Sequence, residues 1–186
     1  MPTPRDPMPV RRILADAAEV DRCSRRVADA LVGRDVVLVG IRTGGYHWAR
    51  RLAGLLAAAG HAPPLGALDI ALYRDDVTTR LVPEVGASEV PVRLDGAEVV
   101  LVDDVLYTGR TVRAALDALL DYGRPRAVRL AVLVDRGHRE LPIAADLVGM
   151  VCATGADERV RVELAEAGPG PSDRVVVRGP AEGAGG

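Results

Sequence analysis

Nearly continuous runs of aliphatic residues recur along the chain, and none approaches the length of a membrane-spanning helix. They occupy residues 36–41, 99–102, 127–134 and 146–151. Unbroken β-branched and aliphatic runs of this length are typical of strands buried on both faces of a sheet. The pattern therefore predicts a central, mostly parallel sheet built from these segments.

Segments with other periods lie before, between and after these runs. Apolar positions at helical spacing predict helices over residues 13–32, 46–59 and 112–122. Residues 68–73 predict another strand, and residues 159–164 and 174–178 alternate like a β-hairpin at the edge of the fold. Helices that alternate with buried strands predict an α/β fold.

Prolines and glycines mark both ends of the chain and one long connection. The ends predict disordered tails at residues 1–10 and 179–186, around a single domain over residues 11–178. Residues 77–91 have no clear period and contain Pro83, Gly86 and Pro91. A connection of this kind is either an active-site lid or poorly ordered.

The composition narrows the class of protein without identifying it. The 186 residues are 48% hydrophobic and 27% charged, which is typical of a globular domain with a substantial core. The net charge of −2 gives no overall attraction to nucleic acid or anionic membranes. The chain contains no lysine, which excludes Schiff-base chemistry, and its two cysteines have no metal-ligand spacing. We expect Cys23 and Cys152 to be reduced core thiols in a cytoplasmic protein.

The run at residues 99–102 leads into a candidate phosphate site. Asp103 and Asp104 follow it, and then come Thr108, Gly109 and Thr111 at the start of a predicted helix. Gly109 lets the backbone direct N–H groups toward one point, where the helix also presents its positive dipole end. Paired carboxylates beside this cradle predict a phosphorylated sugar with Mg²⁺ nearby. An ordinary strand–loop–helix corner with a solvated aspartate pair would have the same spacing.

This stretch resembles the 5-phosphoribosyl-1-pyrophosphate (PRPP) motif of type I phosphoribosyltransferases. The motif comprises hydrophobic residues, two acidic residues, a few variable positions and then Thr-Gly-X-Thr. The matching residues here are Val99, Val100, Leu101, Val102, Asp103, Asp104, Val105, Leu106, Tyr107, Thr108, Gly109, Arg110 and Thr111.

Longer phrases resemble one family, the PyrR family of pyrimidine operon regulators with uracil phosphoribosyltransferase activity. These phrases lie at residues 69–76, 100–111, 123–125 and 133–143, and the similarity extends over residues 36–148. The resemblance implies a type I phosphoribosyltransferase fold with a flexible β-hairpin flap and a small C-terminal β-hairpin. It also implies conversion of uracil and PRPP to UMP and pyrophosphate, a requirement for Mg²⁺, pyrimidine-operon mRNA as a partner, and a homodimer or homotetramer.

The resemblance also assigns roles to residues. Asp103 and Asp104 would act on the ribose hydroxyls and contact Mg²⁺ indirectly, through the substrate. The other sets would bind pyrophosphate (Thr43, Gly44, Gly45 and Arg74), the nucleobase (Arg136, Gly137 and His138) and RNA (Arg22, Arg25, Arg26 and Arg139). His138 could equally be a structural loop residue, and charges such as those of the three helical arginines usually form a solvated face.

Several positions depart from the family pattern. Relatives commonly have Thr-Arg-Gly where this chain has Thr43-Gly44-Gly45, so one cation for pyrophosphate is missing unless Arg42 replaces it. Asp29, Ala144 and Met150 stand where basic residues or histidine are usual in or near the RNA surface. Two alternatives stay open, namely a nucleotide-sensing RNA-binding regulator with little catalysis, and a phosphoribosyltransferase for another base without RNA binding.

Overall fold

The computed structural model describes residues 8–42, 44–73, 88–168 and 172–180. Its centre is a five-stranded, wholly parallel sheet in the order β3-β2-β4-β5-β6. The strands are β2 (Val37–Ile41), β3 (Leu65–Leu68), β4 (Glu98–Leu106), β5 (Ala127–Asp135) and β6 (Leu147–Val151). The four predicted buried runs are thus all strands of one sheet, and the predicted α/β fold with a central, mostly parallel sheet is confirmed.

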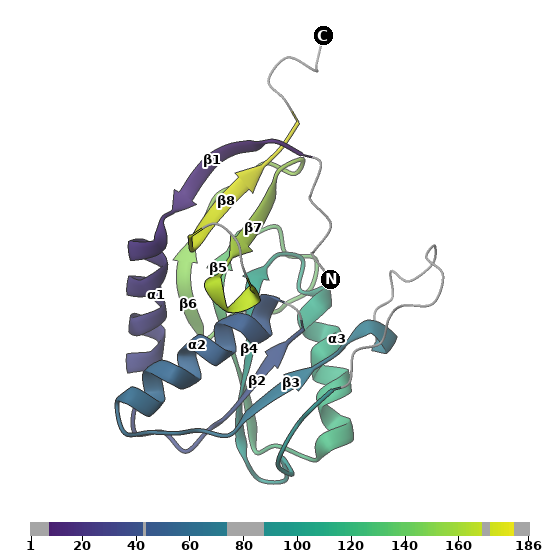
Figure 1. Cartoon of the computed structure of the whole chain (residues 1–186). Coiled ribbons are helices and arrows are strands. Elements are labelled where there is room, and N and C mark those ends of the chain that lie inside the picture. Colours follow the sequence, from purple (N-terminus) through teal and green to yellow (C-terminus); the bar gives the residue numbers. More distant parts are fainter. Residues whose placement is uncertain (1–7, 43, 74–87, 169–171, 181–186) are drawn as a thin grey trace.

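Helices cover both faces of the central sheet (Figure 1). Helices α1 (Ala17–Asp29) and α2 (Gly44–Ala58) cover one face, and α3 (Arg110–Leu119), extended by the 3₁₀ turn Leu120–Tyr122, covers the other. Side chains alternate along β4, so that Val100 and Val102 join the core under α1 and α2 while Val99 and Leu101 join the core under α3. A strand apolar on both faces is what this double packing requires.

A second, antiparallel sheet lies above the first in Figure 1, in the order β1-β8-β7. Its strands are β1 (Val10–Ala15), β7 (Arg159–Glu163) and β8 (Arg174–Arg178), and the 3₁₀ turn Ala165–Ala167 lies between β7 and β8. The predicted C-terminal hairpin is therefore confirmed, although it carries a third strand from the start of the chain. Val175 and Val177 of β8 join the core under α1 and α2, which fixes the small sheet to the domain.

Two predicted elements are wrong in part. The helix predicted from residue 13 starts only at Ala17, because the preceding residues form β1 and pair with β8, a partner that lies far away in the sequence. The strand predicted over residues 68–73 ends at Leu68, since the Asp69 side chain accepts a hydrogen bond from the Ala71 amide at 2.8 Å and starts the 3₁₀ turn Ala71–Tyr73.

Some expectations fall on residues outside the described part of the chain. Residues 77–87 of the predicted flap (77–91) and most of both predicted tails belong to this group. Within the described part, Glu89 forms an antiparallel bridge with Ala67 at the edge of β3. Cys23 and Cys152 are both buried and free, as expected. No helix among the described residues is long and apolar enough to cross a bilayer.

A buried hydrogen-bond relay joins α1 to α2. Trp48, the only tryptophan, is fully buried, and its Nε1 donates to Ser24 Oγ at 3.0 Å. The Ser24 hydroxyl in turn donates to the Val20 carbonyl at 2.7 Å. The relay satisfies the indole N–H in the core shared by the two helices.

We expect Ser24→Ala to lower the free energy of unfolding by about 1–3 kcal/mol, because it leaves the buried Trp48 N–H without its acceptor. Urea unfolding followed by Trp48 fluorescence measures the change. Ser172→Ala, at an exposed position, is the matched control and should change stability by less than about 0.5 kcal/mol. Equal stabilities for the two variants would contradict the role of the relay.

Candidate active site

Strand register brings three loops to one edge of the central sheet. Gly40 pairs with Val102 across β2 and β4, and Leu106 pairs with Asp135 across β4 and β5. The segments that follow β2, β4 and β5 therefore leave the sheet side by side at its carboxyl edge. Ligands of open α/β sheets bind at this edge.

The first turn of α2 lies directly against the backbone of β2 and β4. A Cβ added to Gly40 would come within 2.5 Å of Tyr46 Cα, and one added to Gly45 would come within 2.3 Å of the Val102 carbonyl oxygen. Such contacts are impossible, so only glycine permits this approach. It brings the amino end of α2, with its unpaired N–H groups, next to the two aspartates of β4.

Asp103 and Asp104 lie inside β4 rather than after it, because pairing with β5 continues to Leu106. Asp103 is only 6% exposed, and its Oδ1 accepts a hydrogen bond from the Asp104 amide at 3.0 Å. Asp104 Oδ1 accepts one from the Val105 amide at 2.9 Å. Burial raises the pKa of the Asp104 carboxyl, and this effect outweighs its hydrogen bonds and the nearby His47, which act to lower the pKa.

The candidate phosphate cradle adopts the backbone geometry that the sequence predicts. Gly109 precedes the first turn of α3 with φ +93°, a left-handed conformation that favours glycine. The Thr108 hydroxyl oxygen accepts a hydrogen bond from the Arg110 amide at 3.4 Å. The Arg113 amide donates to the Gly109 carbonyl at 2.9 Å. The amino end of α3 therefore presents backbone N–H groups and a positive dipole end to an anion.

The loop after β5 closes over this cradle. The amides of Glu140 and Leu141 donate to the Thr108 carbonyl at 3.0 and 3.2 Å. Arg139 holds the loop in place, since it donates to the Asp135 carboxylate at 2.5 Å and to the Tyr107 carbonyl at 2.7 Å. Arg139, predicted as an RNA contact, is thus engaged in the architecture of the site.

Arg136 and His138 form a platform beside Tyr107. The Arg136 guanidinium lies over the Tyr107 ring, 4.0 Å from its centroid, and donates to Thr154 Oγ1 at 3.1 Å. His138 adopts φ +58°, its Nε2 lies 2.7 Å from the Thr154 carbonyl oxygen, and its ring meets Tyr107 edge-on at 5.8 Å. The predicted nucleobase residues are therefore brought together. Thr154 was not foreseen, because no local pattern marks it.

Only part of the set predicted to bind pyrophosphate belongs to the described residues. Gly44 and Gly45 open α2 at the site, whereas Thr43 and Arg74 lie outside the described residues. Arg42 stacks on Tyr46 at 5.6 Å from the ring centroid.

Three of the four arginines predicted to contact RNA, Arg22, Arg25 and Arg26, lie on α1, away from the carboxyl edge. Arg22 pairs with Glu19, Arg25 pairs with Asp21 at 2.7 Å, and Arg26 donates to the Gly149 carbonyl of β6. Two of the three positive charges are therefore offset within their own helix.

The donors present suit a metal that arrives with a substrate. No group of three or more His, Cys, Asp or Glu side chains in the described part of the chain is arranged to hold a metal ion. Asp103 and Asp104 supply two neighbouring carboxylates, and Mg²⁺ commonly binds one or two carboxylates together with substrate phosphates. The residues present therefore fit Mg²⁺ shared with a phosphorylated ligand.

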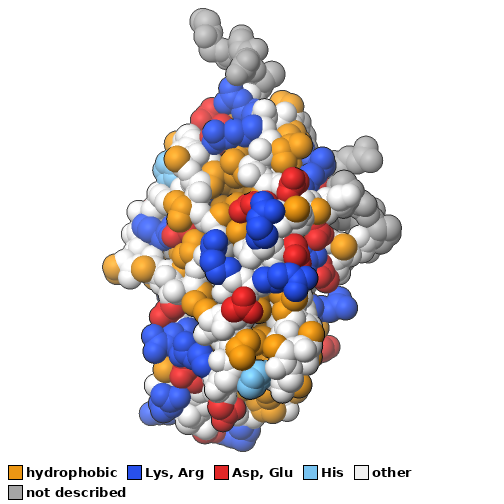
Figure 2. All heavy atoms as spheres, turned by 90° about the vertical axis from the view of Figure 1, so that its left-hand side faces the viewer, with side chains coloured by type: hydrophobic (Ala, Val, Ile, Leu, Met, Phe, Trp, Pro, Cys, Tyr) orange, Lys and Arg blue, Asp and Glu red, His pale blue; other side chains and the backbone are white. Residues whose placement is uncertain are grey.

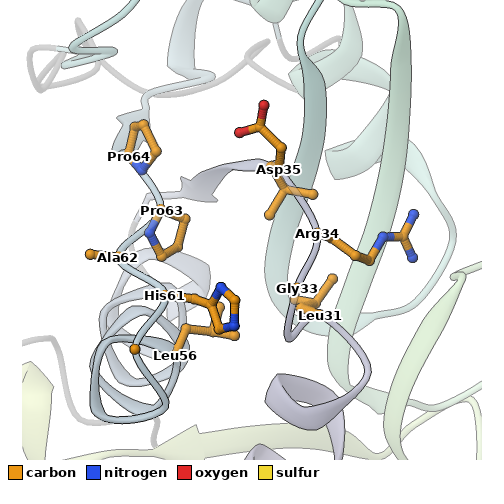
Figure 3. A pocket seen from close by; sticks show the side chains of 11 residues that line it. Leu31, Gly33, Arg34, Asp35, Leu56, His61, Ala62, Pro63 and Pro64 are labelled. Atoms are coloured by element: carbon orange, nitrogen blue, oxygen red, sulfur yellow. The ribbon is translucent and has the colours of Figure 1, made fainter.

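A separate hollow of about 350 Å³ lies at the opposite, amino end of β2 and β3 (Figure 3). Leu31 and Leu56 line it, and His61 faces Gly33 and Arg34 across it. The carboxyl ends of α1 and α2 lie here, so the hollow lacks the helix N–H groups that attract phosphates. The candidate catalytic and binding side chains lie at the carboxyl edge of the sheet instead.

The fold and this site define a phosphoribosyltransferase. Residues 10–165 match the phosphoribosyl transferase domain family. Among solved structures, a Trypanosoma cruzi hypoxanthine phosphoribosyl transferase is similar with a TM-score of 0.68, 18% identity and coverage of 94% of this chain and 95% of that one. A Staphylococcus aureus hypoxanthine phosphoribosyltransferase has a TM-score of 0.60, 18% identity and 81% coverage of both chains. These structures share the fold.

Curated sequences narrow the class. The bifunctional protein PyrR of Enterococcus faecalis is 51% identical over 86% of this chain and 92% of its own length. The bifunctional PyrR proteins of Syntrophobacter fumaroxidans (49% identity, 89% and 92% coverage) and Chloroflexus aurantiacus (50% identity, 90% and 96% coverage) are similarly close. The chain belongs to the PyrR family of phosphoribosyltransferases.

We expect the double variant Asp103→Asn/Asp104→Asn to fold while its phosphoribosyl transfer falls at least tenfold. The carboxylates stand at the site and carry little of the hydrophobic packing, and a lost hydrogen bond to a charged group costs about 1.5–3 kcal/mol. Steady-state kinetics with PRPP and circular dichroism measure the two effects. Asp117→Asn, on the exposed side of α3, is the matched control and should keep full activity. Normal turnover by a folded double variant would refute the assignment.

Proposed function

We propose that this chain transfers the phosphoribosyl group of PRPP to uracil, forming UMP and pyrophosphate. The observation that carries the proposal is the adjacent pair Asp103 and Asp104 on β4, which stands between the glycine-rich starts of α2 and α3. A pair of anion-binding helix ends flanking two carboxylates matches a ligand with a sugar between two phosphate groups. PRPP is such a ligand.

Each part of PRPP has a place in this proposal. Thr108, Gly109, Arg110 and Thr111 hold the 5′-phosphate at the amino end of α3. Asp103 and Asp104 orient the ribose hydroxyls, and Gly44 and Gly45 receive the pyrophosphate with help from Thr43 and Arg74. Mg²⁺ bound with the substrate neutralises negative charge on the pyrophosphate leaving group.

The chemistry we propose is a direct displacement at the anomeric carbon through an oxocarbenium-like state. No side chain among the described residues at the site is an obvious activated nucleophile, and the two carboxylates can stabilise positive charge that develops on the ribose. Backbone N–H groups at α2 stabilise the departing pyrophosphate. The roles of these residues are thus positioning and electrostatic stabilisation.

The platform of Tyr107, Arg136 and His138 supports a nucleobase site beside the ribose. The exposed Tyr107 ring offers a flat surface for a base, while the buried Arg136 guanidinium supports that ring from below, and the polar groups of the loop can bind the base edges. Uracil in particular is inferred from membership of the PyrR family rather than from these contacts. We place the protein in the cytoplasm, where thiols such as Cys23 and Cys152 stay reduced.

An assay of purified protein with PRPP and a panel of bases tests this function. We expect UMP formation with uracil, abolished by EDTA and restored by Mg²⁺, and little product with hypoxanthine or orotate. High-performance liquid chromatography quantifies the nucleotide products. Activity with hypoxanthine or orotate in place of uracil would overturn the base assignment, and no transfer to any base would overturn the enzymatic proposal.

Family membership also favours a second function, the binding of pyrimidine-operon mRNA by a homodimer or homotetramer. Figure 2 views the molecule from the side on which α1 lies in Figure 1, and its arginines (blue) are interspersed with acidic groups (red). The pairs Arg22–Glu19 and Arg25–Asp21 belong to α1 on this side. RNA affinity therefore requires the arginines of several subunits to act together.

We expect the protein to bind the leader RNA of its own operon weakly, with an affinity that falls steeply with salt and rises with UMP. Replacing Arg22, Arg25 and Arg26 together by alanine should weaken binding several-fold, because phosphate contacts need cations. Mobility-shift titrations with and without UMP measure this, and Arg113→Ala on α3 is a control for charge. No binding at low salt in either condition would leave a phosphoribosyltransferase without this regulatory function.

A further inference from the structure

The Asp104 carboxylate lies against the amino end of α2, where the pyrophosphate is proposed to bind. A Cβ added to Gly44 would come within 2.1 Å of Asp104 Oδ2 and 2.4 Å of its Cγ. The carboxylate can therefore occupy this place only because residue 44 has no side chain. Gly44 differs in this respect from the other glycines that bring α2 close to the sheet.

The neighbours of the three glycines show the difference. Gly40 and Gly45 face backbone atoms, so a side chain at either position would push α2 away from β2 or β4. Gly44 faces the end of a side chain that can rotate about its own bonds. A methyl group at residue 44 would thus displace the Asp104 carboxylate and leave the helix in place.

The Asp104 carboxylate and pyrophosphate are both negatively charged. Unpaired N–H groups and the positive end of the helix dipole favour an anion at the amino end of α2. Two anions at one helix end repel each other and cannot fill the same space. The Asp104 carboxylate is also held within its own strand, because its Oδ1 accepts a hydrogen bond from the Val105 amide at 2.9 Å.

We propose that Gly44 makes the amino end of α2 a shared anion site, at which the Asp104 carboxylate competes with the pyrophosphate group. This inference rests on the proposed function, because it assigns pyrophosphate to α2. The residue at position 44 then determines pyrophosphate affinity. When pyrophosphate displaces the Asp104 carboxylate, that carboxylate becomes free to bind the ribose hydroxyls. Binding of pyrophosphate at α2 therefore completes the ribose site on β4.

Titration calorimetry with pyrophosphate in metal-free buffer tests the competition directly, without PRPP, a base or turnover. We expect Gly44→Ala and Asp104→Asn each to bind pyrophosphate about tenfold more tightly than the natural chain, since each removes the competing carboxylate charge from the helix end. The double variant should gain no more than either single change, because both remove the same competitor.

Gly54→Ala is the matched control. Gly54 lies in the same helix and a Cβ there would meet nothing within 4 Å, so the change makes the same glycine-to-alanine replacement in α2 away from Asp104. Its pyrophosphate affinity should equal that of the natural chain. Circular dichroism establishes that each variant is folded, and an unfolded Gly44→Ala would leave Asp104→Asn as the deciding variant.

Unchanged or weaker pyrophosphate binding by either folded single variant overturns the inference, as does an absence of binding by all of them. An equal gain in the Gly54→Ala control also overturns it, because the gain would then come from helix propensity. Tighter binding by both variants in a protein that forms no UMP would support the shared site and refute the proposed reaction. The two proposals can therefore fail separately.

Discussion

The close contact between the first turn of α2 and the backbone of β4 is the constraint on which the site depends. Gly40 and Gly45 permit it, because any Cβ at these positions would overlap backbone atoms. The contact places the amino end of one helix beside the carboxylates of β4, while Gly109 places the amino end of α3 beside the same strand. Two positive helix ends thus flank one acidic pair, and this charge arrangement suits a ligand with phosphates at both ends.

The rest of the site is held by polar contacts among loops rather than by the core. Arg139 ties the loop after β5 to Asp135 and Tyr107, and Arg136 links that loop to Thr154 after β6. Asp103 and Asp104 are the exception, because they occupy positions within a core strand. Their burial raises the pKa of Asp104, as expected of a group placed for function at a cost in stability.

The candidate active site and the proposed RNA-binding arginines differ in how the structure arranges their charges. Asp103, Asp104, the amino ends of α2 and α3 and the loop after β5 lie together at one edge of the sheet, and α2 begins there with Gly44. On the side away from the site, carboxylates offset Arg22 and Arg25 of α1. The described residues therefore support our proposal for catalysis more directly than our proposal for RNA binding.

The sequence by itself determined the buried strands β2, β4, β5 and β6 and the cradle at Gly109. Their signals are local, since a strand covered on both faces must be apolar throughout and a left-handed turn before a helix favours glycine. It also placed Asp103 and Asp104 at the site through a contiguous motif.

Only the tertiary structure decided where distant segments meet. Strand β1 exists because β8 pairs with it, so the helix predicted from residue 13 began too early. Strand β3 forms because it pairs with β2, so the strand predicted over residues 68–73 was placed too late. The contact of Gly44 with Asp104 and the support of Arg136 by Thr154 likewise join residues far apart in the chain. Local patterns carry no record of such partners, because the partners are chosen by the packing of the whole domain.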